Sequence, residues 1–421
     1  MTTSVRQLLR GILHLGLGEM LGRVCWMAIL IILGHWYGVV VLGVYALAAT
    51  VTQYLQPVID FGLRHIGARL MARYPLSGAE IVRRVQRRRL AMAGAVLPFI
   101  LLYAMLVKLP PDMKVFLFVF SSCGALYALS LDWAAWGKGQ LHMIGLARAV
   151  IPLSILVFLT VGRGNAEHAL WWAVAGNALG FALQGMIFWA WWKRHKPAGT
   201  VDDLDAISDS LAWRRTSVMG VAWLGNLAFN SIDMLMLGVM SNPEQVGLYS
   251  AAYRVLNQVL VVYYLLTQSL YPQFVQQSVE ERARMLKARF LLPLLGAGVV
   301  IATLVAVSRR PVLTILFGHQ FLIAGPLLLL LAWAIPLDFL TSYLSNAYIA
   351  WGMEKKILLC TTIAAVTDVV LNLIWIPTYG ATAAAVNTLI SYVIFLISLA
   401  LAGRSARELA RGTQPQAAIV A

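Results

Sequence analysis

The sequence predicts an all-α, polytopic membrane protein of about 12 transmembrane helices in two six-helix lobes. Three observations predict this fold class. Apolar residues make up 60% of the 421 residues, only 12% are charged, and the mean hydropathy is +0.76. The apolar residues come in blocks of roughly 20, the length that a helix needs to cross a ~30 Å hydrocarbon core. A short sequence pattern also occurs twice along the chain, which indicates two related halves.

The repeated pattern stands where one apolar segment ends and the next begins. The first copy consists of Leu33-Gly34, Gly43, Tyr45 and Ala48. The second copy, at a constant offset of 204 residues, consists of Leu237-Gly238, Gly247, Tyr249 and Ala252. A second echo has an offset of 215 residues and relates Ala135-Trp136-Gly137 to Ala350-Trp351-Gly352. Membrane proteins built from two similar halves are typically transporters, because the halves can rock around a site held between them.

Twelve spans are expected in chain order. They cover residues 12–35, 38–60, 90–108, 114–132, 144–161, 168–192, 216–240, 246–272, 289–308, 322–350, 356–376 and 380–402. The first block contains Glu19 and Arg23 and lacks a small-residue cleavage site, which favours a span over a cleavable signal. The stretch 309–322, where Arg309-Arg310-Pro311 precedes a short apolar run, is expected to form a half-buried turn.

The basic residues predict the orientation of these spans. With the N-terminus in the cytoplasm, 26 of the 33 Lys and Arg residues lie in the inner loops or at the inner ends of spans, and five lie in the outer loops or at the outer ends. Arg23 and Arg254 lie deeper within spans. This bias places both termini in the cytoplasm. It also accounts for the net charge of +15 through contact with anionic lipid rather than nucleic acid. Six spans per half make the repeat parallel, with its axis along the membrane normal.

The expected domain organisation follows from the join between the halves. The lobes are residues 1–192 and 216–403, with a cytoplasmic linker over 193–215 and a cytoplasmic tail over 404–421. The outer loops are short and leave no room for a soluble catalytic domain, so the chain is not expected to be an enzyme. Three cysteines inside spans offer neither metal spacing nor a disulfide framework, and no cofactor or metal is expected.

Polar side chains within the spans form stripes at helical spacing. The stripes include Gln53, Gln56 and Asp60; Asn226, Asn230 and Asp233; Arg254, Asn257 and Gln258; and Asp368 with Asn372. Ionisable groups in hydrocarbon cost several kcal/mol, so they usually face a bundle interior or a wet cavity. The alternative is that neutral polar residues hold helices together by hydrogen bonds worth about 0.6–2 kcal/mol each.

The charged members of the stripes have competing interpretations. Glu19 and Arg23 lie four residues apart and form either a self-neutralising pair or part of a site. Asp60 is either an ion-coupling group or the cap of a helix end. Arg254 stays charged and suits a phosphate, whereas Asp233 can titrate when burial raises the pKa of a carboxylate.

Several segments resemble bacterial flippases that move lipid-linked oligosaccharide or polysaccharide units. They are Gly43-Val-Tyr-Ala-Leu-Ala, Pro57-Val-Ile-Asp-Phe-Gly-Leu63, Leu131-Asp-Trp-Ala-Ala-Trp-Gly-Lys138, Ser231-Ile-Asp-Met-Leu-Met-Leu-Gly238, Val246-Gly-Leu-Tyr-Ser-Ala-Ala252 and Leu270-Tyr-Pro272. These flippases, of the O-antigen type, belong to the multidrug/oligosaccharidyl-lipid/polysaccharide exporter superfamily. The resemblance implies two six-helix lobes, an undecaprenyl-pyrophosphate-linked oligosaccharide as substrate, and ion- or potential-driven alternating access.

The leading hypothesis is therefore a flippase that serves cell-surface polysaccharide synthesis, such as the O-antigen of lipopolysaccharide. Its expected substrate-binding residues are Arg23, Arg254, Gln53, Asn226, Asn230, Asn257 and Gln258, and its expected ion-coupling residues, for H⁺ or Na⁺, are Glu19, Asp60 and Asp233. The first alternative is a cation-coupled multidrug exporter of the same superfamily, with an acidic cavity. The second is a membrane polymerase or ligase for glycans, which the short outer loops disfavour.

Overall fold

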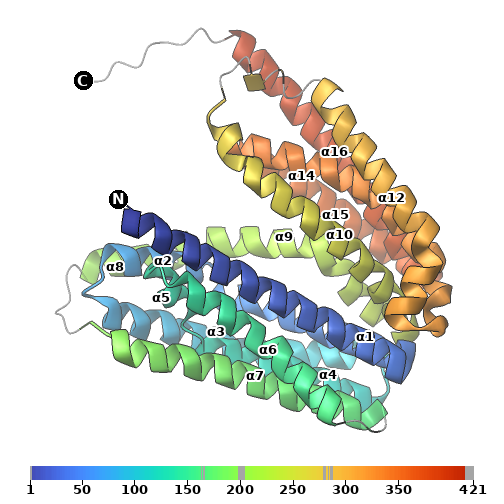
Figure 1. Ribbon diagram of the computed structural model, residues 1–421, viewed down its shortest axis with the longest axis horizontal. Coiled ribbons are helices and arrows are strands. Elements are labelled where there is room, and N and C mark those ends of the chain that lie inside the picture. Colours follow the sequence, from blue (N-terminus) through green and yellow to red (C-terminus); the bar gives the residue numbers. More distant parts are fainter. Residues whose placement is uncertain are drawn as a thin grey trace. The chain divides into compact units, whose positions relative to one another are not determined.

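The computed structural model describes residues 2–162, 164, 166–197, 204–277, 281–282, 284 and 288–412. Within these ranges the regular elements are α-helices and two short 3₁₀ helices (Figure 1). The chain divides into two compact units. Unit 1 comprises residues 1–227 and 242–247, and unit 2 comprises residues 228–241 and 248–421. The lobe boundaries expected from the sequence, at residues 192 and 216, stay a prediction, and the residues 413–421 of the expected tail lie outside the described ranges.

Unit 1 is built on one long helix with a break in it. α1 (Thr2–Asp60) changes direction at Gly38, where φ is 89° and ψ is −174°. A left-handed φ of this size favours glycine, because a Cβ atom there would collide with the backbone. The break at Gly38 therefore separates the first two expected spans, 12–35 and 38–60.

The remaining helices of unit 1 follow in chain order. They are α2 (Leu63–Arg73), α3 (Gly78–Leu106), α4 (Pro111–Cys123), η1 (Gly124–Leu129), α5 (Asp132–Gly137), α6 (Leu141–Val161), α7 (Ala166–His195), α8 (Leu204–Ser210) and the first half of α9 (Trp213–Met240). α8 lies in the expected linker. Arg84 and Arg88 of α3 donate hydrogen bonds to Ser208 and to the Leu211 carbonyl, which hold that linker helix against unit 1.

Small residues allow the closest helix contacts of unit 1. A Cβ atom at Gly18 of α1 would lie 2.2 Å from the backbone of Gly145 in α6, so these two helices pack backbone to backbone. The two copies of the repeated glycine also meet. A Cβ atom at Gly43 would lie 2.2 Å from the Pro243 carbonyl oxygen, and one at Gly247 would lie 2.1 Å from the Val39 carbonyl oxygen. The repeated pattern thus marks a direct contact between its own two copies.

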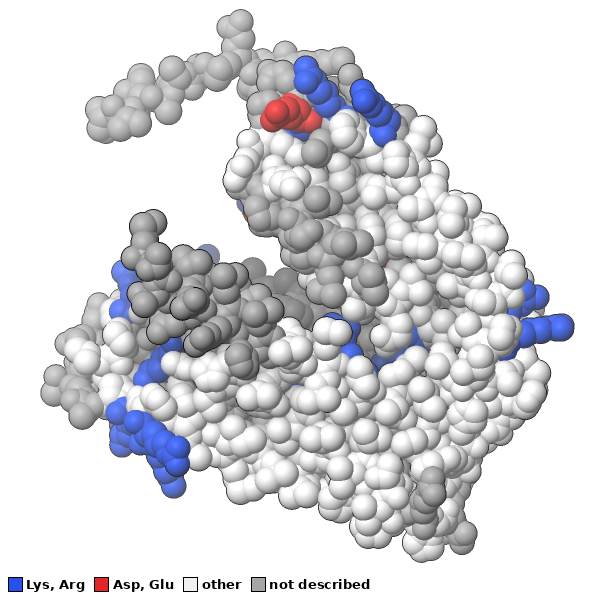
Figure 2. Space-filling model, in the orientation of Figure 1, with Lys and Arg blue, Asp and Glu red and all other residues white. Residues whose placement is uncertain are grey.

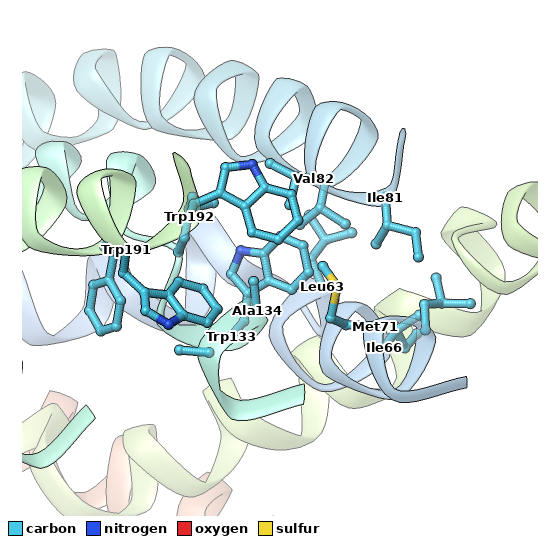
Figure 3. Close-up of a cluster of buried hydrophobic side chains, with 14 of the residues drawn as sticks. Leu63, Ile66, Met71, Ile81, Val82, Trp133, Ala134, Trp191 and Trp192 are labelled. Carbon is cyan, nitrogen blue, oxygen red and sulfur yellow. The ribbon is translucent and has the colours of Figure 1, made fainter. Parts of the chain in front are cut away.

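A hydrophobic core of unit 1 gathers aromatic and aliphatic side chains from α2, α3, α5, α6, α7 and α8 (Figure 3). Trp133 of α5 is fully buried between α2 and α3, and Trp191 and Trp192 of α7 close the cluster. Ile207 of the linker helix α8 and Leu211, directly after it, belong to the same cluster. This core packs α2, α3 and α5 together, and these helices carry Arg64, Arg89 and Asp132.

Unit 2 contains the second half of α9 and the helices that follow. These are α10 (Pro243–Val275), α12 (Ala288–Phe317), η2 (His319–Ala324), α13 (Gly325–Ala332), α14 (Ala334–Ala350), α15 (Glu354–Tyr379) and α16 (Ala381–Gly412). α12 runs through Arg309-Arg310-Pro311, where a turn was expected, and ends at Phe317 before Gly318 with φ of 98°. The turn prediction was wrong over residues 309–317, because a proline inside a membrane helix removes one backbone hydrogen bond without ending the helix.

The long helices confirm the expected fold class. Each of the twelve expected spans lies on described helix, and nine segments of the described chain are long and apolar enough to cross a membrane. Many large apolar side chains are exposed, such as Phe99, Val307 and Ile315. Figure 2 shows broad surfaces without Lys, Arg, Asp or Glu, with the charged residues in small groups. Exposed apolar surface of this extent suits a multi-pass membrane protein.

Candidate functional site

Unit 2 buries a group of polar side chains that we call the acid cluster. It takes Asp233 from α9, Tyr249 from α10, Asp368 and Asn372 from α15, and Asn387, Thr388 and Ser391 from α16. All seven side chains are buried, and the exposed fractions of Asp233 and Asp368 are only 6% and 2%. Four helices therefore aim polar groups at one place inside unit 2.

The two carboxylates of the acid cluster share one amide. Asn372 Nδ2 donates to Asp233 Oδ1 at 2.6 Å and to Asp368 Oδ2 at 3.1 Å. The other oxygen of Asp233 accepts from the Tyr249 hydroxyl at 2.7 Å and from Thr388 Oγ1 at 3.0 Å. Asp368 Oδ1 accepts from Ser391 Oγ at 2.9 Å. Neutral donors thus surround both carboxylates and hold them beside each other.

The acid cluster has no built-in counter-charge among the residues that the structure describes. The ion pairs in the described part of the chain join residues of unit 1, and none of them includes Asp233 or Asp368. Two buried carboxylates repel each other and are costly unless a proton or a cation joins them. Asn387, which donates to Asn372 Oδ1 at 2.8 Å, keeps its own Oδ1 buried without a hydrogen-bond partner. The cluster therefore has a spare oxygen ligand in addition to the two carboxylates.

The donor set of the acid cluster indicates which ion it suits. Its potential ligands are carboxylate, amide and hydroxyl oxygens, which hard cations prefer. Within the described ranges, no group of three or more His, Cys, Asp or Glu side chains is arranged to hold a metal ion. Two carboxylates with neutral oxygens fit a proton or an alkali cation better than a transition metal.

Unit 1 buries a contrasting group, the ion-pair network of Asp60, Arg64, Arg89 and Asp132. Arg89 Nε lies 2.8 Å from Asp60 Oδ1, and Arg64 Nη2 lies 3.2 Å from Asp132 Oδ2. Tyr127 donates its hydroxyl to Asp60 at 2.9 Å, and the Arg89 guanidinium lies 4.7 Å from the Tyr127 ring centre. Arg89 is fully buried and also donates to the Ser130 carbonyl. Two positive and two negative charges balance, so this network is neutral by itself.

The structure places the expected ion-coupling residues in three different environments. Asp233 lies in the acid cluster, and Asp60 is paired with Arg89. Glu19 pairs with Arg148 of α6 across the α1–α6 contact, whereas the sequence suggested Arg23 as its partner. Both members of the Glu19–Arg148 pair are partly exposed. Of the three expected residues, Asp233 alone has no arginine in an ion pair with it among the residues that the structure describes.

The expected substrate-binding residues are mostly accessible from outside their own unit. In unit 1, Arg23 and Gln53 of α1 are exposed. In unit 2, Asn230 and Gln258 are exposed and Arg254 and Asn257 are half-buried. The side chain of Asn226 lies outside the described residues. Asn257 is bonded to the Tyr253 hydroxyl, and that hydroxyl also donates to the Asn230 carbonyl.

Comparisons with known proteins give related sequences and folds. A family model described as "Polysaccharide biosynthesis protein" matches residues 8–278. The chain is 21% identical over 240 residues to a probable low-salt glycan biosynthesis flippase of Haloferax volcanii, covering 56% of this chain and 49% of that protein. It is 26% identical over 199 residues to a teichuronic acid biosynthesis protein of Bacillus subtilis, covering 46% and 40%. The chain thus spans about half the length, or less, of the curated relatives it matches.

Solved structures share the fold at low sequence identity. A lipid II flippase in an inward closed conformation superposes with a TM-score of 0.69 at 15% identity, over 93% of this chain and 87% of that one. An inward-facing multidrug resistance transporter superposes with a TM-score of 0.71 at 13% identity, over 96% of this chain and 100% of that one. Both likenesses extend through the two halves, as the expected twelve-helix, two-lobe fold requires.

Proposed function

Because the chain belongs to the polysaccharide biosynthesis protein family, we propose that it flips a lipid-linked oligosaccharide across the bacterial inner membrane. The flipped unit would serve the synthesis of a surface polysaccharide such as O-antigen. Translocation by alternating access makes and breaks no covalent bond, so the proposed activity is transport rather than catalysis. The family match over residues 8–278 is the observation that carries this proposal.

The carrier lipid belongs to the proposal as well. An undecaprenyl-pyrophosphate-linked unit has an anionic head and an apolar tail that stays in the bilayer, so only the head needs a polar path. Arg23 and Arg254 are the cations proposed to hold the pyrophosphate, since guanidinium groups grip phosphate oxygens in pairs. Gln53, Asn226, Asn230, Asn257 and Gln258 are proposed to hydrogen-bond the sugar hydroxyls.

Energy coupling is proposed to reside in the acid cluster of unit 2. Asp233, Asp368 and Asn387 would hold H⁺ or Na⁺, and the bound ion would neutralise the carboxylate pair. The contacts that support this are the amide shared by both carboxylates and the spare Asn387 oxygen. Asp60 and Glu19 are already paired with arginines, so we assign them structural roles.

A second candidate function is cation-coupled export of small drugs. The likeness to a multidrug resistance transporter, with a TM-score of 0.71, favours it as far as fold goes. The acid cluster would serve either function, because it concerns the driving ion and not the cargo. Surface polysaccharide and drug susceptibility in a deletion strain of the native host discriminate between the two.

The test of the proposed function replaces the two proposed phosphate-binding arginines. Arg254→Ala and Arg23→Ala are each expected to abolish surface polysaccharide while the protein still inserts in the membrane. Lys355→Ala, which removes an exposed charge outside the spans, is the matched control and should leave the output unchanged. Normal polysaccharide output from both arginine variants would contradict the proposed head-group site. Altered drug susceptibility with intact polysaccharide in the deletion strain would favour the exporter.

A further inference from the structure

The segment Leu131–Lys138 contributes one tryptophan to the core of unit 1 and another to its surface. Trp133 is its buried anchor, and a Cβ atom at Gly67 of α2 would lie only 2.7 Å from the Trp133 ring. Trp136, three residues later on α5, is 39% exposed. One short helix therefore fixes itself in the core with one indole and presents another at the surface.

The exposed ring belongs to a group of aromatic side chains from three helices. His65 of α2 lies between Trp136 of α5, at 5.3 Å between ring centres, and Trp223 of α9, at 5.8 Å. Trp223 is 54% exposed, and His65 is half-buried. We call Trp136, His65 and Trp223 the aromatic platform. All three residues belong to unit 1.

Close backbone contacts hold the aromatic platform in place. Gly62 between α1 and α2 has φ of 83°, and a Cβ atom there would lie 2.3 Å from the Thr216 carbonyl oxygen of α9. A Cβ atom at Gly220 would lie 2.7 Å from the Phe61 ring, which is itself stacked on Trp213 at 5.0 Å. Two glycines thus seat the start of α9 against the α1–α2 corner, and this seating brings Trp223 to His65.

Arg64 lies beside the aromatic platform, and its hydrogen-bond donors are not all used. The Arg64 guanidinium lies 5.7 Å from the Trp136 ring centre and is 25% exposed. Its Nη2 reaches Asp132, while its Nε is buried with no hydrogen-bond partner in the described part of the chain. A buried donor without a partner is costly unless a ligand or water satisfies it. Burial, and then the charge of Arg64, lower the pKa of His65, so its imidazole is neutral near pH 7 and can both donate and accept.

We propose that the aromatic platform and Arg64 form a loading site for the glycosyl pyrophosphate headgroup of the lipid-linked substrate. This inference rests on the proposed flippase function. A sugar ring presents C–H groups on its face, which pack against the electron-rich face of an indole. The adjoining pyrophosphate accepts charge-assisted hydrogen bonds from a guanidinium. A glycosyl pyrophosphate combines a sugar face with a pyrophosphate. Trp136 can contact the sugar, and Arg64 beside it can bind the pyrophosphate.

The position of the platform agrees with loading from the cytoplasm. The expected topology places Arg64, Trp136 and the start of α9 at the basic, inner ends of the spans, where lipid-linked units are available before flipping. Tryptophans at a membrane surface often serve only as interfacial anchors. An interfacial anchor needs neither a histidine packed between two indoles nor an arginine with an unsatisfied donor.

Unit 2 contains a related pair that serves as an internal comparison. Trp351, in the second copy of the Ala-Trp-Gly echo, has the Arg282 guanidinium 5.8 Å from its ring centre. Its indole N–H donates to the Phe274 carbonyl at 3.2 Å, which ties the ring to the core of unit 2. The Arg–Trp pair of unit 2 is thus engaged in packing, whereas Trp136 is presented beside a second exposed indole.

Photo-crosslinking in the native host tests the loading site with the natural substrate. The photoreactive residue p-benzoylphenylalanine replaces Trp136 in the full chain and, as the matched control, Trp171, which is 45% exposed at the other end of unit 1's helices. Mass spectrometry identifies the lipid attached at each position. A polyisoprenyl pyrophosphate glycan is expected at position 136 and phospholipid alone at position 171. Phospholipid alone at position 136 would overturn the loading site.

Two further variants separate stacking and charge from mere apolar contact. In the position-136 photoprobe background, Arg64→Gln combined with Asp132→Asn should reduce glycolipid labelling about tenfold relative to Asp132→Asn alone, the loss expected for a hydrogen bond to a charged group. The second substitution removes the carboxylate that Arg64→Gln would otherwise leave buried without its partner. Trp223→Phe should retain labelling, whereas Trp223→Leu should lose most of it. Equal labelling with Phe and Leu would contradict stacking. Surface polysaccharide in the deletion strain separately tests the proposed function. If the deletion strain loses its polysaccharide but position 136 labels only phospholipid, the loading site is wrong and the proposed function stands.

Discussion

The two units of the molecule bury polar side chains in opposite ways. In unit 1, Asp60 and Asp132 are each paired with an arginine, and the four charges cancel. In unit 2, Asp233 and Asp368 are held together by neutral amides and hydroxyls, with no ion pair among the described residues. The charges of unit 1 balance without a bound ion, whereas a buried carboxylate pair needs a proton or a cation that binds to it.

This difference separates a structural device from a functional one. A buried ion pair can be replaced by apolar groups at little cost, but removal of one partner leaves an uncompensated charge. A carboxylate pair without a counter-charge changes its electrostatic state whenever a proton or cation binds, and a transporter can link such a change to a conformational preference. We propose from this contrast that the Asp60–Arg89 pair of unit 1 stabilises the fold, whereas the acid cluster of unit 2 couples transport to an ion.

The largest expected effect comes from removing the guanidinium at the centre of the unit 1 network. Arg89→Met leaves Asp60 buried without its partner and is expected to cost about 3–5 kcal/mol of the free energy of unfolding. Thermal or denaturant unfolding of the purified protein in detergent measures this loss. Arg87→Met changes an exposed arginine two residues away and is expected to leave stability nearly unchanged.

A double variant sharpens the same prediction. Asp60→Asn combined with Arg89→Met removes both charges and should recover much of the lost stability. A single Arg89→Met variant as stable as the wild type would mean that the network does not stabilise unit 1. The comparison between the units would then lose its first half.

The next largest effect is expected on transport and not on stability. Asp233→Asn and Asp368→Asn keep the shape of each side chain while removing the charge that would hold the ion. Each is expected to reduce the ion-dependent transport rate about 5–150-fold, the usual range of coupling between two sites. Unfolding should shift little or toward greater stability, because repulsion between the carboxylates is relieved. Cell-surface polysaccharide and unfolding midpoints, measured on the same variants, check both statements.

The control for these substitutions lies on the same helix. Thr362→Val alters an exposed α15 side chain that donates to the Leu358 carbonyl of its own helix. It is expected to preserve both transport and stability. If Asp233→Asn unfolds the protein as severely as Arg89→Met, the acid cluster is a packing element, and the contrast between the two units fails.

The sequence predicted the spans well because blocks of about 20 apolar residues leave a membrane helix few alternatives. It also predicted the Asp368–Asn372 stripe, because residues four apart share a helix face. Asn387, Thr388 and Ser391 have matching spacing on α16 and complete the acid cluster. They were not singled out, because neutral polar residues within spans are common as hydrogen-bonding contacts between helices.

Arg89 shows where sequence reasoning stopped. It ends an arginine-rich run over residues 83–89, a composition typical of a solvated stretch, yet Val82, Val85 and Gln86 at helical spacing from it are buried. That spacing could have predicted its burial. Its partner Asp60 and the carbonyl of Ser130 lie far away in the chain, so the pairing depends on how α1, α3 and the η1 turn pack. Periodicity indicates that a charged side chain points inward but does not identify its partner.

The smallest expected effect concerns Glu19, a partly exposed acidic residue of unit 1. Glu19 and Arg148 form a partly exposed pair, and such pairs contribute about 0–1 kcal/mol to stability. Glu19→Gln is therefore expected to lower the unfolding midpoint slightly and to leave transport intact, as judged by surface polysaccharide and detergent unfolding. Arg148→Gln, which removes the other partner, should behave alike. If Glu19→Gln stopped transport as completely as Asp233→Asn, unit 1 would also take part in ion coupling, and the division of roles between a charge-balanced lobe and an acidic lobe would no longer hold.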